Sequence, residues 1–395
     1  MIFPRLSMVH KTMLEILRAD TGAAPWPELP EIVWARLLDL AALHRVPTLV
    51  AWRITADMKL PVPEAIRKRC DNLLRKGTWL NFISLSKADR IGTLLAKEDI
   101  RSVLLKGPSL SRMAYQAQEL RIFRDLDILV SRADIHRARR ILLAHGFRST
   151  MDPENEQHYL QNHFHIIFTD ESGTVVELHW DLVRPQSLYA FSGEGVIERS
   201  RPHGDHPSTN DEAAEDQVLH AVVQSISEGF SSLVRVCDLD TLIRLRNTSL
   251  DWDGISRRAR NGNLAFPLAF LFRLSSQLLA TPVPREAILA PPSRIALTAL
   301  NALQPAEFLL TRSTKRVKGY THLLRFWLFP GQRLAVLWQM LRGHPRDRTR
   351  PAPQRALSRT ERWRLILLRC VLLLRLVAIQ IAAIIRVPMN SLRGT

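Results

Sequence analysis

The sequence has 395 residues, of which 46% are hydrophobic and 24% charged, and its formal net charge is +17 at pH 7. This hydrophobic content is enough for a packed core, which excludes disorder of the whole chain. The three cysteines, Cys70, Cys237 and Cys370, lie far apart, which excludes a disulfide scaffold and favours a reducing, cytoplasmic compartment.

The positive charge is concentrated in the C-terminal part of the chain. Residues 312–395 contain 18 Lys and Arg but only 2 Asp and Glu, so residues 1–311 are nearly neutral. This basic helical tail is expected to attract an acidic partner, either nucleic acid or an anionic membrane surface. Within it, 363–386 is apolar and long enough to span a membrane, but Arg369 and Arg375 disfavour a span, so membrane-surface association or packing on the body is the favoured alternative.

Residues 1–100 are predicted to form an N-terminal helical region. After Pro30, apolar residues recur every three to four positions up to residue 40, which is the period of an amphipathic helix. Pro63 precedes Glu64 and Ala65 at a second predicted helix start, which continues towards Leu95.

Residues 101–184 show a different pattern and predict a small α/β core. Short apolar or alternating segments at 102–107, 125–130, 164–168 and 174–180 indicate about four strands, the last two joined as a hairpin. A short helix fits between the first two strands, and another is expected from Asp134 to the stop signal at Gly146.

Residues 185–211 are rich in Pro, Ser, Gly and charge and are predicted to be a linker or loop. Helical periodicity returns over 212–311, where Asp238 and Asp240 are interpreted as surface or capping residues, with the alternative that Asp238 supports the site from behind the metal-binding acids. The predicted fold class is therefore α+β, a small mixed-sheet core between N-terminal and C-terminal helical regions.

Three acidic residues in the predicted core are the main candidates for chemistry. Asp125 and Asp127 are two apart in a strand and therefore point the same way, and Glu177 lies in a neighbouring predicted strand. Like charges at this spacing repel unless they are solvated at a strand end or bind a cation, and carboxylate oxygens suit a divalent metal. The pattern predicts a metal site built by Asp125, Asp127 and Glu177.

Lys106, Gly107 and Ser109 follow the first predicted strand and open a predicted helix. Glycine lets the backbone approach a phosphate, and a helix N-terminus offers free amide donors. A phosphate loop beside a metal-binding acidic cluster is an arrangement suited to nucleotidyl transfer.

These segments together resemble an uncharacterised bacterial nucleotidyltransferase family of the DNA polymerase beta-like nucleotidyltransferase superfamily. The similarity lies in the Leu-Lys-Gly at 105–107, the Arg-x-x-x-Asp-x-Asp-x-Leu-Val at 121–130, the helix ending in Gly-Phe at 146–147 and the Glu-Leu-His-Trp at 177–180. It extends over roughly residues 30–330.

The resemblance implies a role for each matching position. Asp125, Asp127 and Glu177 would be the catalytic, metal-binding acids, with Mg²⁺ as cofactor and Mn²⁺ as the alternative. The positions near the nucleotide would be Lys106, Gly107, Ser109, Arg121 and His179. The substrate would be an NTP, ATP among them, and the acceptor a small molecule, peptide, protein or RNA.

Other functions stay open at this level. The chain could be a catalytically degenerate member that binds a nucleotide or a protein partner, or an RNA-binding protein that acts through its basic tail. The cluster of His158, His163 and His165 could bind zinc together with His179, although no cysteine or HxxxH helix accompanies it.

Overall fold

The computed structural model describes residues 6–18, 28–56, 60–151, 156–185, 187–204, 206–246, 248–284, 287, 294–303, 306–310 and 324–342. The apolar basic stretch 363–386 and most of the predicted basic tail lie outside these residues. Within the described part of the chain, no helix has both the length and the hydrophobicity that crossing a membrane requires.

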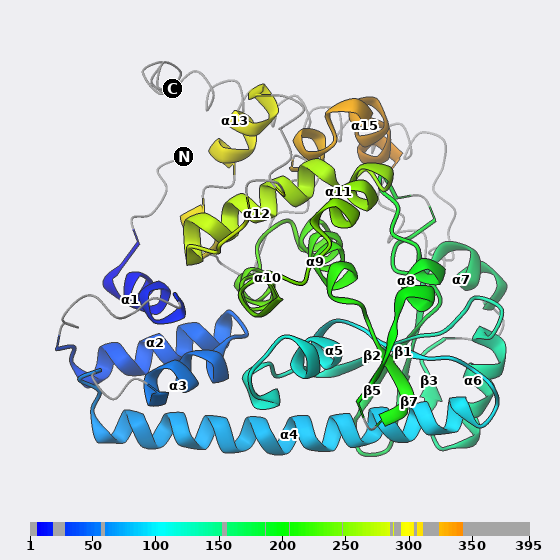
Figure 1. The fold of residues 1–395 in the computed structure, drawn as a ribbon, viewed down its shortest axis with the longest axis horizontal. Helices are drawn as coiled ribbons and strands as arrows, with labels where there is room; N and C mark the ends of the chain where they lie inside the picture. Colours follow the sequence, from blue (N-terminus) through cyan, green and yellow to red (C-terminus); the bar gives the residue numbers. More distant parts are fainter. Residues whose placement is uncertain are drawn as a thin grey trace, which may run out of the picture.

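The N-terminal region is helical, as predicted, and α4 is its longest element. Buried residues of α4 recur every three to four positions at its sheet end, through Leu85, Ala88, Ile91 and Leu95, so one face packs inward. In Figure 1, α4 runs beneath both the other N-terminal helices and the sheet. The helices of this region are α1 (Met8–Leu17), α2 (Glu31–Leu43), α3 (Pro47–Ala56) and α4 (Glu64–Ala96).

A seven-stranded mixed sheet forms the core, which confirms the α+β class. Its strand order is β3-β4-β5-β2-β1-β7-β6, and the predicted hairpin is the antiparallel pair β4 and β5. The first part of the sheet comes from β1 (Val103–Leu104), β2 (Asp125–Leu129), β3 (Arg148–Ser149), β4 (His165–Thr169) and β5 (Val175–His179). Between them lie α5 (Lys106–Met113), η1 (Gln118–Leu120), α6 (Ile135–Ala144) and α7 (Glu156–Asn162).

The segment 185–211 is not a plain linker, so this prediction was wrong. It contains α8 (Gly193–Arg199), β6 (Arg201–His203) and β7 (His206–Asp211), and β7 pairs in parallel with β1. The sheet is therefore larger than the four strands expected. The polar composition misled because β6 is the edge strand, where exposed polar residues are tolerated, and because β7 lies inside the sheet but carries polar residues that are buried there, Thr209, Asn210 and Asp211.

The two faces of the sheet have different partners. Leu126, Ile128 and Val176 point into a hydrophobic cluster that also contains residues of α4 and α6. On the other side, Val103 and Leu129 belong to a second cluster shared with the C-terminal helices. Because α4 and α6 cover one face, the polar residues that alternate with these apolar ones face α5, α9 and α10.

The C-terminal region packs above the sheet as a group of helices (Figure 1). The helix α5 contacts both α9 and α10, which joins the sheet to this region. Its elements are α9 (Ala214–Glu228), α10 (Leu233–Arg246), α11 (Trp252–Asn261), α12 (Ala265–Leu279), α13 (Arg294–Leu303) and η4 (Ala306–Leu309), followed by η5 (Pro330–Gln332) and α15 (Arg333–Arg342).

Candidate active site

Strand register brings the three predicted acids together. The strands β2 and β5 are parallel neighbours, and Asp127 lies directly opposite Glu177. Residues two apart in a strand share a face, so Asp125 lies on the same side. One carboxylate oxygen from each of Asp125, Asp127 and Glu177 falls within 4.8 Å of the others. The sheet thus concentrates three negative charges in one small volume.

Lys106 supplies a positive charge inside this acidic cluster. Its Nζ forms an ion pair with Asp127 and lies 3.5 Å from Glu177 Oε2. Burial would lower the pKa of Lys106, but the charges of Asp127 and Glu177 outweigh burial and raise it. The ammonium group is therefore charged at neutral pH and partly balances the carboxylates.

The backbone at Lys106 adopts a left-handed conformation, with φ of 54°. A non-glycine residue in this region costs about 1–3 kcal/mol and persists only where the surroundings fix it. Two contacts help to hold Lys106 in this conformation. Its ammonium group forms the ion pair with Asp127, and its backbone N–H donates to Glu212 Oε2 at 3.5 Å.

The pKa values of the two aspartates shift in opposite directions. Burial would raise the pKa of Asp127, but Lys106 and His179 outweigh it and hold that pKa well below its usual range. For Asp125, burial and then the charges of Asp127 and Glu177 raise the pKa. Asp125 is thus the acid whose charge this arrangement stabilises least, and a cation bound beside it would relieve the repulsion.

Two histidines complete the buried edge of the cluster. The Nε2 of His179 lies 3.0 Å from Asp127 Oδ1 and 3.3 Å from Glu177 Oε2. Burial and Lys106 would lower the pKa of His179, but its hydrogen bonds to both carboxylates raise it. Burial, followed by the charge of His179, lowers the pKa of His165 to about 2, so this ring is neutral.

The predicted phosphate loop divides into two parts. Lys106 faces the carboxylates, whereas Ser109 is fully buried and accepts a hydrogen bond from Gln217 Nε2 at 2.9 Å. At Gly107 an added Cβ would lie 2.7 Å from the Cβ of Phe123, so close packing alone requires glycine there. The structure therefore gives Gly107 and Ser109 packing partners within the protein.

Replacing Gly107 with Ala is accordingly expected to lower the free energy of unfolding by about 1–3 kcal/mol, because the new methyl group must displace Phe123. Urea unfolding followed by circular dichroism measures this loss. Gly331→Ala is the matched control, since a Cβ at Gly331 meets no atom within 4 Å. Equal unfolding midpoints for Gly107→Ala and the unmodified protein would contradict the packing argument.

Arg121 lies away from the carboxylates, in a buried ion pair with Asp238 of α10. Its Nε donates to Asp238 Oδ1 at 2.6 Å and its Nη2 to Oδ2 at 3.1 Å, while Tyr115 Oη donates to the same carboxylate at 2.7 Å. Burial would lower the pKa of Arg121, but Asp238 raises it. The interpretation of Asp238 and Asp240 as surface or capping residues was wrong, because both side chains are buried. The ion pair with Arg121 favours the alternative for Asp238, in which it supports the segment that leads into β2.

Sequence reasoning missed Glu212, a buried acid close to Lys106. Glu212, at the end of β7, is fully buried and lies 2.8 Å from His220 Nδ1. The only sequence signal for Glu212 is that an acid directly follows a strand. This signal points to the site only once β7 is known to run parallel to β1, because the ends of the two strands then lie together. A separate hollow of about 520 Å³ lies between α8, α9 and α11; Glu212 lines it, and the three acids do not.

The donor atoms fit a hard divalent cation. Asp125, Asp127 and Glu177 offer oxygen only, which is the ligand type that Mg²⁺ and Mn²⁺ prefer. His165, Glu177 and His179 form a second group whose donor atoms also lie within 4.8 Å of one another. Nitrogen-rich donors suit zinc better, but Nε2 of His179 is already engaged with Asp127, which favours the carboxylate group.

Comparison with known proteins agrees with this geometry. Searching curated proteins gives no significant match to the chain. Residues 30–280, which include the sheet, the acidic cluster and most of the described C-terminal helices, match a family described as an uncharacterised nucleotidyltransferase. A match over this share of the sequence, together with an acidic cluster that could bind metal, shows that the chain belongs to this nucleotidyltransferase family.

Proposed function

We propose that the protein is a metal-dependent nucleotidyltransferase that moves an NMP group from an NTP to an acceptor hydroxyl and releases pyrophosphate. The observation that carries the proposal is the register of β2 against β5, which gathers Asp125, Asp127 and Glu177 within one metal-sized space. A bound Mg²⁺, or Mn²⁺, would neutralise charge on the phosphates and orient them.

The protein's own groups then have distinct roles. Asp125 and Asp127 would hold the cation, and Glu177 would share in binding it and take the proton of the acceptor hydroxyl. The acceptor oxygen forms a bond to the α-phosphorus as the bond to the β-phosphate oxygen breaks, and the electron pair leaves with pyrophosphate. Lys106, already among the carboxylates, is placed to stabilise phosphate charge, and His179 keeps Asp127 and Glu177 oriented.

The role of Arg121 follows from its ion pair. Because Nε and Nη2 of Arg121 donate to Asp238 and its Nη1 donates to the Ile122 carbonyl, we assign Arg121 to positioning the segment before β2. The carbonyl group of the same residue accepts a hydrogen bond from Asn81 Nδ2 of α4 at 2.9 Å, so two helical regions hold this segment.

Transfer is tested with four α-³²P-labelled NTPs, each incubated with the purified protein and an extract of host cells. We expect one NTP or more to label an acceptor when Mg²⁺ or Mn²⁺ is present, and EDTA to abolish the labelling. The Glu177→Gln variant should lose it as well, because an amide can neither accept the proton nor balance a cation. Labelling that persists in Glu177→Gln would contradict the proposal.

The ion pairs of Lys106 support a second candidate function, a protein that binds nucleotide without transferring it. The ammonium group already contacts two of the three carboxylates, as a permanent counter-ion would. The labelling experiment separates the two functions when calorimetry also measures NTP binding with and without the metal. Metal-dependent NTP binding without any labelled product would favour the non-catalytic function.

A further inference from the structure

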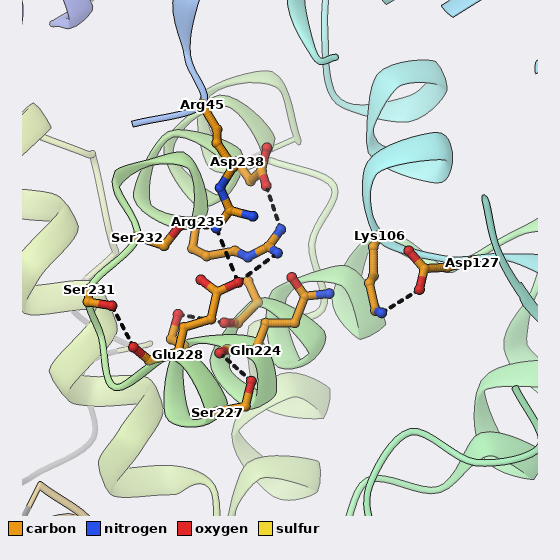
Figure 2. A network of polar contacts seen from close by, with 12 residues as sticks. Arg45, Lys106, Asp127, Gln224, Ser227, Glu228, Ser231, Ser232, Arg235 and Asp238 are labelled. Carbon is orange, nitrogen blue, oxygen red and sulfur yellow. Dashed lines mark hydrogen bonds and ion pairs between the residues drawn. The ribbon is translucent and has the colours of Figure 1, made fainter. Parts of the chain in front are cut away.

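Two side chains of the C-terminal helices face Lys106 from across the site. Gln224 belongs to α9 and Arg235 to α10, and both side chains are about nine-tenths buried. Figure 2 shows the Gln224 amide group directed towards Lys106, with Arg235 on its other side. The helices α5 and α10, which carry Lys106 and Arg235, are in contact, so the two cations belong to adjoining elements.

Arg235 is held in place by two acids but keeps an unused donor. Its Nη2 donates to Glu228 Oε1 at 3.0 Å, and its Nη1 lies 3.5 Å from Asp238 Oδ2. Its Nε is buried and has no hydrogen-bond partner among the described residues. A buried guanidinium N–H that lacks an acceptor is costly, so an acceptor supplied by a ligand would stabilise it.

Besides the acids Glu228 and Asp238, a further cation lies near Arg235. Arg45, from the turn between α2 and α3, donates to Ser232 Oγ at 2.6 Å and to Glu228 Oε1 at 3.3 Å, as Figure 2 also shows. Within the described residues, the side-chain amide group of Gln224 makes no hydrogen bond, and the Ser227 hydroxyl group donates to the backbone carbonyl of Gln224 instead. The site thus offers a fixed cation and a free amide opposite Lys106.

We propose that Arg235 and Gln224 bind the β- and γ-phosphates of the NTP, so that the triphosphate lies between Lys106 and the α9–α10 pair. This inference rests on the proposed function and adds a subsite to it. An extended polyanion suits this arrangement, because its oxygen atoms can accept hydrogen bonds from both cations and from the Gln224 amide group at once. Pyrophosphate, once released, carries the charge that Arg235 stabilises.

Calorimetry with inorganic tripolyphosphate and Mg²⁺ tests the subsite without requiring an acceptor or a base preference. We expect Arg235→Gln to bind tripolyphosphate at least about tenfold more weakly than the unmodified protein, because a charge-assisted hydrogen bond is lost. Arg235→Lys, which keeps the charge, should show a smaller loss. Arg244→Gln is the matched control on the same helix, since Arg244 pairs with Asp240 instead, and its binding should be unchanged.

A purely structural role for Arg235 would give a different pattern. The variants are first compared by circular dichroism and thermal unfolding, and in those that fold, unchanged tripolyphosphate affinity in Arg235→Gln overturns the inference. If Arg235→Gln does not fold, Arg235→Lys and Gln224→Ala decide, and affinities equal to that of the unmodified protein in both overturn it. If the unmodified protein binds no NTP and labels no acceptor, the proposed function itself fails.

Discussion

Replacing Asp127 with Asn is expected to reduce nucleotidyl transfer by more than about 100-fold, the loss typical of removing one electrostatic contact to a transition state. Asp127 is the central acid, because it contacts Lys106 and His179 and lies opposite Glu177. The amide keeps the size of the carboxylate but not its charge. The measurement is the initial rate of labelling at saturating NTP.

The fold of this variant should persist, since packing on the apolar face of β2 is unchanged and Glu177 still balances the charge of Lys106. Asp170→Asn is a suitable control, because Asp170 lies at the far end of the β4–β5 hairpin, where it pairs with Lys87 at 2.9 Å. Its transfer rate should match that of the unmodified protein. A folded Asp127→Asn variant that transfers at the normal rate would remove Asp127 from the active site.

Replacing Asp238 with Asn is expected to lower the free energy of unfolding by about 3–5 kcal/mol. The substitution leaves Arg121 buried without its counter-ion, and Arg235 then adds repulsion. Urea unfolding measures the loss. Asp39→Asn, which breaks an exposed ion pair with Arg69, should change the free energy of unfolding by no more than about 1 kcal/mol.

A double variant separates the charge effect from packing. Arg121→Met combined with Asp238→Leu removes both charges and keeps much of the volume, so it should be more stable than Asp238→Asn alone. A double variant less stable than Asp238→Asn would contradict this expectation. It would mean that the ion pair stabilises the fold by more free energy than an unpaired, buried Arg121 costs.

The candidate site was largely accessible from local sequence patterns. Alternation in a strand fixes that Asp125 and Asp127 share a face, and the turn residues 170–173 fix the hairpin that carries Glu177. These are short-range effects, which depend on neighbours within a few residues. For the same reason, the starts of α2 and α4 after Pro30 and Pro63 were predictable.

Tertiary structure decided what local patterns leave open. The strand β7 forms because β1 offers a pairing edge to a segment about 100 residues later, and β6 then pairs with β7; polar composition alone conceals both strands. Arg121 and Asp238 are 117 residues apart, so no local signal shows that they neutralise each other.

The sequence by itself therefore determined the α+β class, the acidic triplet and the lysine beside it, because strand alternation and turn chemistry act locally. Only the tertiary structure decided that Glu177 stands opposite Asp127, that Arg121 is paired with Asp238, and that Gln224 and Arg235 face Lys106. Strand register and helix packing arise from burial summed over distant segments, and that sum cannot be evaluated from neighbouring residues.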